Sequence, residues 1–265
     1  MALVEVNGVR LLVEESGRGD PLVLVHGSWG DHRVWDLVEP ELARSFRVIR
    51  YDRRGHSGSS DGAESGTRRD DEDDLAALIH TLDLAPANVV GNSFGASIAL
   101  GTASRQPELF RTLCAHEPPL IALAAADPAL AAVGGKIGTV LQLIAGGEAE
   151  AAARTFVDNV AVGPGAWEMM PSEVQSSMVA NADTFAGEQY DPHGSEIDLA
   201  DLGEVGFPVL LTRGDQSPPF FGTITSRVAG IIDGAEVRTL PGAGHIPHMT
   251  HPGPYAAAVT EFMTR

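Results

Sequence analysis

The sequence has little cysteine and few basic residues. Cys114 is its only cysteine, so an internal disulfide is excluded, and the apolar stretch Leu113-Cys-Ala predicts a buried strand position rather than a second nucleophile. Lys and Arg together number 18 against 36 Asp and Glu, which gives a formal net charge of -18. Nucleic acids and anionic membranes attract positive surfaces, so we expect neither as a partner.

Long hydrophobic runs are also lacking. No apolar stretch approaches the roughly 18 residues of a membrane-spanning helix, and Met1 to Val6 contain no basic segment followed by a long apolar one. We therefore expect a cytoplasmic protein. With 265 residues, 43% of them hydrophobic, the chain can bury a full core as one domain. Assembly into a homodimer is compatible with this sequence.

The densest charge lies at residues 68–74, which read Arg-Arg-Asp-Asp-Glu-Asp-Asp. The acids precede a helical pattern from Leu75 to Leu84, and carboxylates stabilise the positive N-terminal end of a helix. Such a cluster could also bind a metal ion. Because a helix start on a solvated face explains the acids, we predict no metal site and no cofactor.

Apolar strand patterns alternate with helical patterns along most of the chain. The strand patterns cover residues 3–6, 10–15, 21–26, 46–51, 88–90, 110–115, 207–212 and 236–240, and the helical ones residues 32–44, 75–84, 94–105, 223–232 and 254–264. Repeated strand and helix units predict an α/β fold, with a mostly parallel sheet and helices on both faces. Asn7-Gly8 predicts a hairpin that forms an antiparallel edge.

The alternation stops between Pro118 and Leu202, where the patterns are helical and no strand is expected. The helical stretches there cover residues 136–145, 148–160 and 172–185. We predict a helical cap at residues 118–202, inserted into a core formed by residues 1–117 and 203–265.

The most informative motif is Gly91-Asn-Ser-Phe-Gly95, which follows a short apolar strand and opens a helix. This is the G-x-S-x-G pattern of a nucleophile elbow. The glycines allow a sharp turn, so the hydroxyl of Ser93 would stand clear at the strand tip, and the N–H of Phe94 would face a developing oxyanion. Ser93 is therefore the candidate nucleophile.

A serine nucleophile needs a histidine base, and His245 is the best candidate. It ends the glycine-rich stretch Pro241-Gly-Ala-Gly-His245 after the last strand, where a loop can carry an imidazole over the edge of the sheet. His248 and His251 follow closely. We expect His251 at the start of the final helix and His248 at the wall of the site.

Together these motifs resemble the α/β-hydrolase superfamily over nearly the whole chain. The resemblance rests on His26-Gly27 after the third strand, Gly91 to Gly95, Gly244-His245 and the cap between the sixth strand and the next. It implies an eight-stranded sheet and a chain order of serine, acid and histidine.

The resemblance also implies an oxyanion hole, formed by the N–H of Phe94 and that of Ser28 or Trp29. His26 would shape this loop rather than act as a base. Residues 51–58 resemble the D-x-R-G-x-G-x-S loop of the superfamily, whose role is largely structural.

The acid departs from the common pattern of the superfamily, which places it after the seventh strand in a loop reading roughly G-x-x-D. Here Gly214-Asp-Gln-Ser217 has serine at that position, and Asp215 lies two residues too early. A second known location is after the sixth strand, where Glu117 stands 24 residues beyond Ser93 and is followed by two prolines. This arrangement resembles that of zearalenone-type lactonases, which use a glutamate after the sixth strand. We predict Glu117 as the acid, with Asp215 as the alternative.

The predicted cap supplies flexible apolar side chains that could line a pocket. We expect Trp167 and Met170 to contact substrate, together with His248 from the core. The predicted reaction is hydrolysis of a small hydrophobic ester or lactone through an acyl-enzyme.

Other functions remain open. A cofactor-free haloperoxidase or perhydrolase would use the same three residues, and a carbon–carbon bond hydrolase would need polar groups for a dienol substrate. A ligand-binding receptor could keep the fold without turnover.

Overall fold

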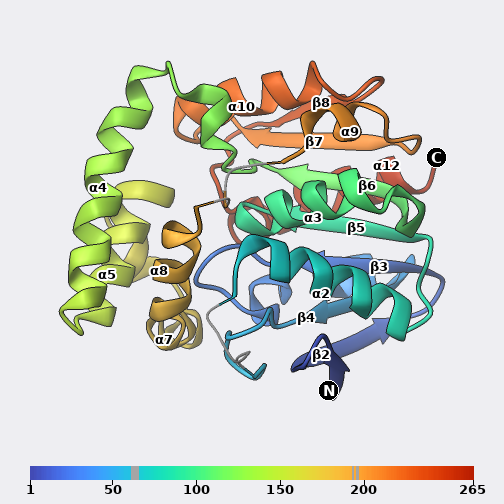
Figure 1. Cartoon of the computed structure of the whole chain (residues 1–265), viewed down its shortest axis with the longest axis horizontal. Helices are drawn as coiled ribbons and strands as arrows, with labels where there is room; N and C mark the ends of the chain where they lie inside the picture. The colour runs from blue at the N-terminus through green and yellow to red at the C-terminus, as the bar shows by residue number, and fades with distance from the viewer. Residues whose placement is uncertain (61–65, 193, 195–196) are drawn as a thin grey trace.

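Eight strands form one sheet within the part of the chain that the computed structural model describes, residues 1–60, 66–192, 194 and 197–265. The strands are β1 (Ala2–Val6), β2 (Val9–Gly17), β3 (Asp20–Val25), β4 (Phe46–Tyr51), β5 (Ala87–Asn92), β6 (Phe110–His116), β7 (Val209–Gly214) and β8 (Glu236–Leu240). Their order is β1-β2-β4-β3-β5-β6-β7-β8 (Figure 1). β2 pairs antiparallel with β1 and β4, and all other neighbours are parallel, so the predicted sheet is confirmed.

Helices cover both faces of this sheet. One face carries α2 (Arg68–Thr81), α3 (Phe94–Arg105) and α10 (Pro219–Ala229), and the other carries η1 (His32–Trp35), α1 (Glu39–Leu42) and α12 (Pro252–Met263). The short helices η2 (Pro107–Leu109) and α11 (Pro247–Thr250) lie in connections. The inner strands β3, β5, β6 and β7 are buried along almost their whole length, as their apolar sequences predict. Among the described residues, we find no helix with the length and apolar character to cross a bilayer.

The helix predicted at residues 32–44 is two short helices instead. The carboxylate of Asp31 accepts a hydrogen bond from the N–H of Arg33 and starts η1. Pro40 lacks an N–H donor and fits only the first turn of a helix, so α1 begins anew beside it. The sequence pattern could not resolve this break, because both helices bury the same apolar face.

The acidic run lies inside α2 rather than before it. Thr67 and Asp70 form a capping box, in which each side chain accepts a hydrogen bond from the other residue's N–H, and the helix therefore starts at Arg68. Asp74 accepts two hydrogen bonds from Arg54 at 2.7 and 2.8 Å. The run is a helix start with arginine partners.

The helical insertion, residues 118–202, lies between β6 and β7. Its helices, together with α9 at its end, are η3 (Ile121–Ala124), α4 (Pro128–Ala145), α5 (Ala149–Phe156), η4 (Val157–Ala161), α6 (Ala166–Met169), α7 (Ser172–Ala180), α8 (Ala182–Tyr190) and α9 (Leu199–Gly203). Figure 1 shows α4, α5, α7 and α8 together beside one end of the sheet, on the left. Leu202 of α9 joins the hydrophobic cluster of the sheet, so the chain is back on the body there.

The insertion has a hydrophobic cluster of its own. Buried side chains of α4, α5, α6, α7 and α8 pack there around Trp167 and Phe185. The body, which comprises the residues outside the insertion, contributes Trp29 from the loop after β3 to this cluster. Trp29 is fully buried, and its ring stacks on that of Phe185 with centroids 4.8 Å apart.

Candidate active site

Ser93 lies at a sharp turn between β5 and α3. Its backbone φ is 54°, a strained value for a residue with a side chain. Two glycines make the turn fit: a Cβ on Gly91 would lie 2.5 Å from the carbonyl oxygen of Gly95, and one on Gly95 would lie 2.3 Å from that of Val25. The strand and helix therefore pack too closely for any larger residue, and the turn presents the Ser93 hydroxyl at the strand tip.

His245 lies beside this hydroxyl. Its Nε2 is 2.9 Å from Ser93 Oγ, within hydrogen-bond distance. The Asn92 side chain donates to the carbonyl oxygen of His245 at 3.0 Å, and the Phe221 ring stacks on the imidazole with centroids 4.3 Å apart. These contacts hold the ring in the orientation that the hydrogen bond needs.

Glu117 approaches the other nitrogen of the same ring. Its Oε2 lies 2.7 Å from His245 Nδ1, and its Oε1 accepts a hydrogen bond from the Gly214 N–H at 2.8 Å. Glu117 is fully buried and has a φ of 46°, the same strained region as Ser93. Burial alone would raise its pKa, but the hydrogen bond to His245 and the nearby imidazoles lower the pKa to about 2. The carboxylate is therefore ionised at neutral pH and can stabilise an imidazolium.

Asp215, the alternative acid, lies elsewhere. Asp215 is exposed, and its Oδ1 accepts hydrogen bonds from the Gly242 N–H at 2.8 Å and the Gln216 side chain at 3.1 Å. These bonds join the turn after β7 to the turn after β8. Of the two candidate acids, Glu117 is the one that the fold brings to His245.

Three residues were candidate oxyanion donors. Phe94 is the first residue of α3, a position at which an N–H has no partner within the helix. The loop after β3 packs on the nucleophile, since a Cβ on Gly27 would lie 3.1 Å from that of Ser93. Ser28 follows and lines the cavity beside Ser93, whereas the Trp29 side chain turns into the insertion. Ser28 and Phe94 thus both lie next to the Ser93 turn.

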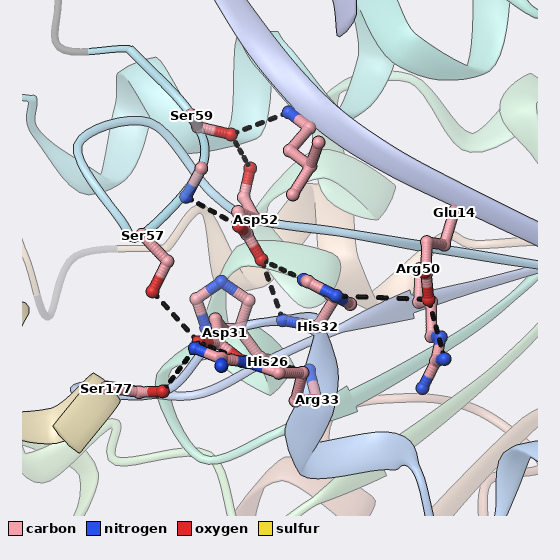
Figure 2. Close-up of polar contacts among 12 residues, drawn as sticks. Glu14, His26, Asp31, His32, Arg33, Arg50, Asp52, Ser57, Ser59 and Ser177 are labelled. Carbon is pink, nitrogen blue, oxygen red and sulfur yellow. Dashed lines mark hydrogen bonds and ion pairs between the residues drawn. The ribbon is translucent and has the colours of Figure 1, made fainter. Parts of the chain in front are cut away.

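The loop after β4 is hydrogen-bonded to the loop after β3 through Asp52 (Figure 2). Asp52 accepts hydrogen bonds from the N–H of His32 at 2.9 Å and that of Gly58 at 2.8 Å, and its Oδ1 lies 2.6 Å from His32 Nδ1. Burial would lower the pKa of His32, but the hydrogen bond and charge of Asp52 raise it overall. The two residues are buried and in hydrogen-bond contact, and this contact joins the loops after β3 and β4.

His26 shapes the same loops, as the sequence predicts. Its Nε2 accepts a hydrogen bond from the Arg53 N–H at 3.0 Å, and its Nδ1 lies 2.8 Å from the Gly27 carbonyl oxygen. Asp31, His32 and Asp52 lie close enough to hold a metal ion. However, the Asp31 carboxylate already accepts hydrogen bonds from Arg33 and Ser57, so these donors use the positions a metal would take.

A cavity of about 70 Å³ opens beside Ser93, several times the ~10–15 Å³ that a single water molecule needs. Its lining joins body loops to the insertion: Gly27, Ser28, Gly30, Asp31, Val34, Asn92, Ser93, Phe156, Val157, Ala161, Val162, Met170, Val174, Ser177, Met178, His245, Ile246, His248 and Met249. Most of these side chains are apolar, so the cavity suits a small hydrophobic group.

The three predicted substrate contacts differ in position. Met170 and His248 line the cavity. Trp167 is not among the described residues of the lining, because its side chain is buried in the insertion's own cluster. His248 packs on the Trp35 ring with centroids 4.6 Å apart, and burial lowers its pKa to about 3, so it is neutral at pH 7. His251 directly precedes α12, at the start of the final helix as expected.

Sequence reasoning missed Arg53, His116 and Glu188. Arg53 and Glu188 are buried and form an ion pair between body and insertion. His116 is buried beside Glu117, and its Nδ1 lies 2.9 Å from the Thr212 hydroxyl. The signal for Glu188 was its helical spacing from polar residues 177, 181 and 184, but that spacing is equally typical of a solvent-facing helix.

The chain matches the model of the alpha/beta hydrolase family over residues 22–258. It is 41% identical to the 2-hydroxymuconate semialdehyde hydrolase of Pseudomonas sp. (strain CF600) over 113 residues, which are 40% of this chain and 39% of that protein. The match thus spans about two fifths of the length of this relative.

Other similarities extend over nearly the whole chain. The zearalenone hydrolase of Bionectria ochroleuca is 26% identical over 96% of this chain and 94% of its own. The crystal structure of an alpha/beta hydrolase from Sphaerobacter thermophilus superimposes with a TM-score of 0.79 at 26% identity, over 98% of this chain and 99% of that one. Further similar proteins carry the names esterase, enol-lactonase and bromoperoxidase.

Proposed function

For this chain, which belongs to the alpha/beta hydrolase family, we propose a serine hydrolase that cleaves a small, uncharged ester or lactone through an acyl-enzyme. One observation carries the proposal. Ser93 Oγ, both ring nitrogens of His245 and the Glu117 carboxylate form a continuous chain of two hydrogen bonds, 2.9 and 2.7 Å long. This is the nucleophile, base and acid arrangement of acyl-transfer enzymes.

Acylation starts with the Ser93 oxygen attacking the substrate carbonyl carbon while His245 Nε2 takes the hydroxyl proton. The imidazolium that forms is stabilised by the ionised Glu117, which keeps its own negative charge. The carbonyl oxygen becomes an oxyanion, for which the N–H groups of Phe94 and Ser28 are the proposed donors. Collapse of the tetrahedral intermediate breaks the ester bond, and His245 returns its proton to the leaving oxygen.

Deacylation uses the same groups, with a water molecule as the nucleophile and Ser93 Oγ as the leaving group. His245 takes a proton from a water molecule, whose oxygen attacks the acyl carbon bound to Ser93. The second tetrahedral intermediate breaks the bond to Ser93 Oγ, which recovers its proton from the imidazolium. A lactone follows the same route, except that its leaving oxygen stays attached to the acyl group.

The cavity supports an uncharged substrate. Asp31 is the only carboxylate among the described lining residues, and none of them is Lys or Arg. A substrate carboxylate would lose its hydration there without a cationic partner, which is strongly unfavourable. Apolar side chains from the insertion, among them Met170 and Met178, would instead contact a short acyl chain or ring.

The test compares p-nitrophenyl butyrate with p-nitrophenyl hemisuccinate, which has a similar length and adds one negative charge. We expect burst kinetics with the butyrate, a kcat/KM at least about 10-fold lower with the hemisuccinate, and covalent labelling of Ser93 by a fluorophosphonate. The Ser93→Ala variant should lose both turnover and labelling.

Other results would point to other functions. Failure of the fluorophosphonate to label wild-type protein would favour a ligand-binding receptor. Turnover that requires peroxide and a carboxylate would favour a perhydrolase. A preference for the hemisuccinate would contradict the proposed uncharged substrate.

A further inference from the structure

A row of polar side chains in the insertion faces the loops of the body. Ser177 lies in α7, Thr184 and Glu188 lie in α8, and Asn181 lies at the junction between the two helices. We call these four residues the polar row. Its members are buried or half-buried, and each has a hydrogen-bond partner in the body.

The first members of the polar row contact the loop at residues 27–31. Asn181 Nδ2 donates to the carbonyl oxygens of Trp29 at 3.1 Å and Gly30 at 3.0 Å. Arg33, which binds the Asp31 carboxylate, donates to Ser177 Oγ at 2.5 Å. The loop that carries the proposed oxyanion donor is therefore held by side chains of the insertion, of which Asn181 binds its backbone directly and Ser177 binds Arg33 beside it.

Glu188 contacts a side chain of the same loop. Ser28 Oγ donates to its Oε2 at 2.5 Å, and the Arg53 guanidinium donates to its Oε1. Side-chain exposure is 5% for Glu188 and 1% for Arg53. The same guanidinium lies over the Phe94 ring, 4.9 Å from its centroid. One buried ion pair thus touches Ser28 and Phe94, the two residues whose N–H groups are the proposed oxyanion donors.

Trp29 links the loop and the insertion in a second way. Its φ is 68°, so the backbone between Ser28 and Gly30 has a conformation that needs outside support. The insertion supplies this support through the Trp29 ring, which stacks on Phe185 and lies beside Phe156 in the insertion cluster. Without the insertion this ring would be exposed, and the strained loop would lose its main anchor.

We propose that Glu188 is a positioning residue for the oxyanion hole: with Arg53 it fixes Ser28 and Phe94, so that the hole is complete only while α8 lies against the body. The inference rests on the proposed serine-hydrolase function and assigns the insertion a part in transition-state stabilisation. A purely structural tie would not need a buried ion pair, since apolar residues of similar volume usually hold such a junction equally well or better.

The test measures kcat, KM and transition-state affinity in Glu188→Gln. Its probe is 1,1,1-trifluoropentan-2-one, whose carbonyl carbon bonds to Ser93 Oγ while the new alkoxide occupies the oxyanion hole. We expect kcat for p-nitrophenyl butyrate to fall about 10- to 100-fold with KM within about 3-fold, and affinity for the ketone to fall by the same factor as kcat. Glu173→Gln, an exposed change of the same type in α7, should leave all three values unchanged.

Two further variants keep the test decisive. Ser28→Ala retains the backbone N–H but removes the contact with Glu188, so its effect and that of Glu188→Gln should be less than additive in the double variant. If Glu188→Gln does not fold, the paired variant Arg53→Met with Glu188→Leu removes both charges together and should show the same loss in kcat and ketone affinity.

Unchanged kcat and ketone affinity in a folded Glu188→Gln protein would overturn the inference. So would a rise in KM alone, because that result indicates only a substrate contact. Wild-type protein that neither cleaves the ester nor reacts with a fluorophosphonate would instead overturn the proposed function, and the inference with it.

Discussion

The interior of the body and its junction with the helical insertion differ in the interactions that stabilise them. In the body, apolar side chains form a continuous hydrophobic cluster on each face of the sheet. At the junction with the insertion, Trp29 is the buried body residue in the insertion cluster, Leu120, Ala124 and Leu202 of the insertion join the cluster of the body, and the polar row adds hydrogen bonds. Apolar burial tolerates small displacements, whereas hydrogen bonds depend strongly on distance and angle. The junction is therefore suited to fixing geometry.

The site is divided in the same way. Ser93, Glu117 and His245 follow the carboxyl ends of β5, β6 and β8, so the body alone holds their hydrogen bonds. The loop of residues 27–31 depends on contacts with the insertion, which also supplies the apolar part of the cavity lining between Phe156 and Met178. Damage to the body should abolish the chemistry, and damage to the junction should weaken transition-state and substrate binding.

The largest effect is expected from Glu117→Gln. The amide can no longer stabilise an imidazolium, so kcat for p-nitrophenyl butyrate should fall by about 10³- to 10⁴-fold. Asp215→Asn is the matched control and should change kcat by less than about 3-fold, because that carboxylate binds the turn after β8. Steady-state kinetics of both variants measure the difference, and the reverse order of effects would make Asp215 the acid.

Trp29→Ala should have the next largest effect. It removes the body's residue from the insertion cluster and should lower the stability by about 3–5 kcal/mol and kcat/KM by about 10- to 100-fold. Trp29→Phe keeps the ring contact with Phe185 and should recover most of the activity. Thermal melts and kinetics measure both properties. Full activity in a folded Trp29→Ala protein would show that the loop does not need the insertion.

Ala161→Phe tests the cavity. Ala161 lies in the lining from the insertion, so a phenyl ring there should exclude longer acyl chains and raise KM for p-nitrophenyl octanoate about 10-fold, with little change for the acetate. Ala180→Phe places the same ring at an exposed position of α7 and should leave the ratio of the two KM values unchanged. Equal effects of both variants would place the acyl group outside this cavity.

Asp71→Asn should give the smallest effect, and the size of that effect depends on pH. Burial raises the pKa of Asp71 to about 7, although the Arg53 charge opposes the shift, from an ordinary value of 3.8. Between these values the unfolded chain has released the proton and the folded protein still holds it, so this group's contribution to stability falls as the pH rises from about 4 to 7. Asp71→Asn removes that contribution.

Melting curves at pH 5 and pH 8 measure the change. For each protein, the measured quantity is the Tm at pH 5 minus the Tm at pH 8. This difference should be a few degrees larger for the wild type than for Asp71→Asn. Asp73→Asn, a more exposed change in the same helix, is the control. Parallel pH dependence of wild type and Asp71→Asn would show that Asp71 titrates without a folded-state shift.

Much of the fold could be predicted because its signals are local. The apolar strands, the Asn7-Gly8 turn and the glycines around Ser93 each reflect steric or burial constraints within a few residues of sequence. The exact helix boundaries depended on caps: α2 begins at Arg68 because Thr67 and Asp70 exchange hydrogen bonds. Trp167 was expected at the cavity, but periodicity could not show which face of its short helix would be buried.

The architecture, the elbow serine and the two carboxylates that could serve as the acid follow from the amino-acid sequence, since they depend on chain stiffness, burial and the order of motifs. The contact of Glu117 with His245, and that of Glu188 with Ser28 across 160 residues of chain, emerge only in the folded protein. Such contacts depend on how closely the strands and helices pack, and a change of about 1 Å makes or breaks a hydrogen bond.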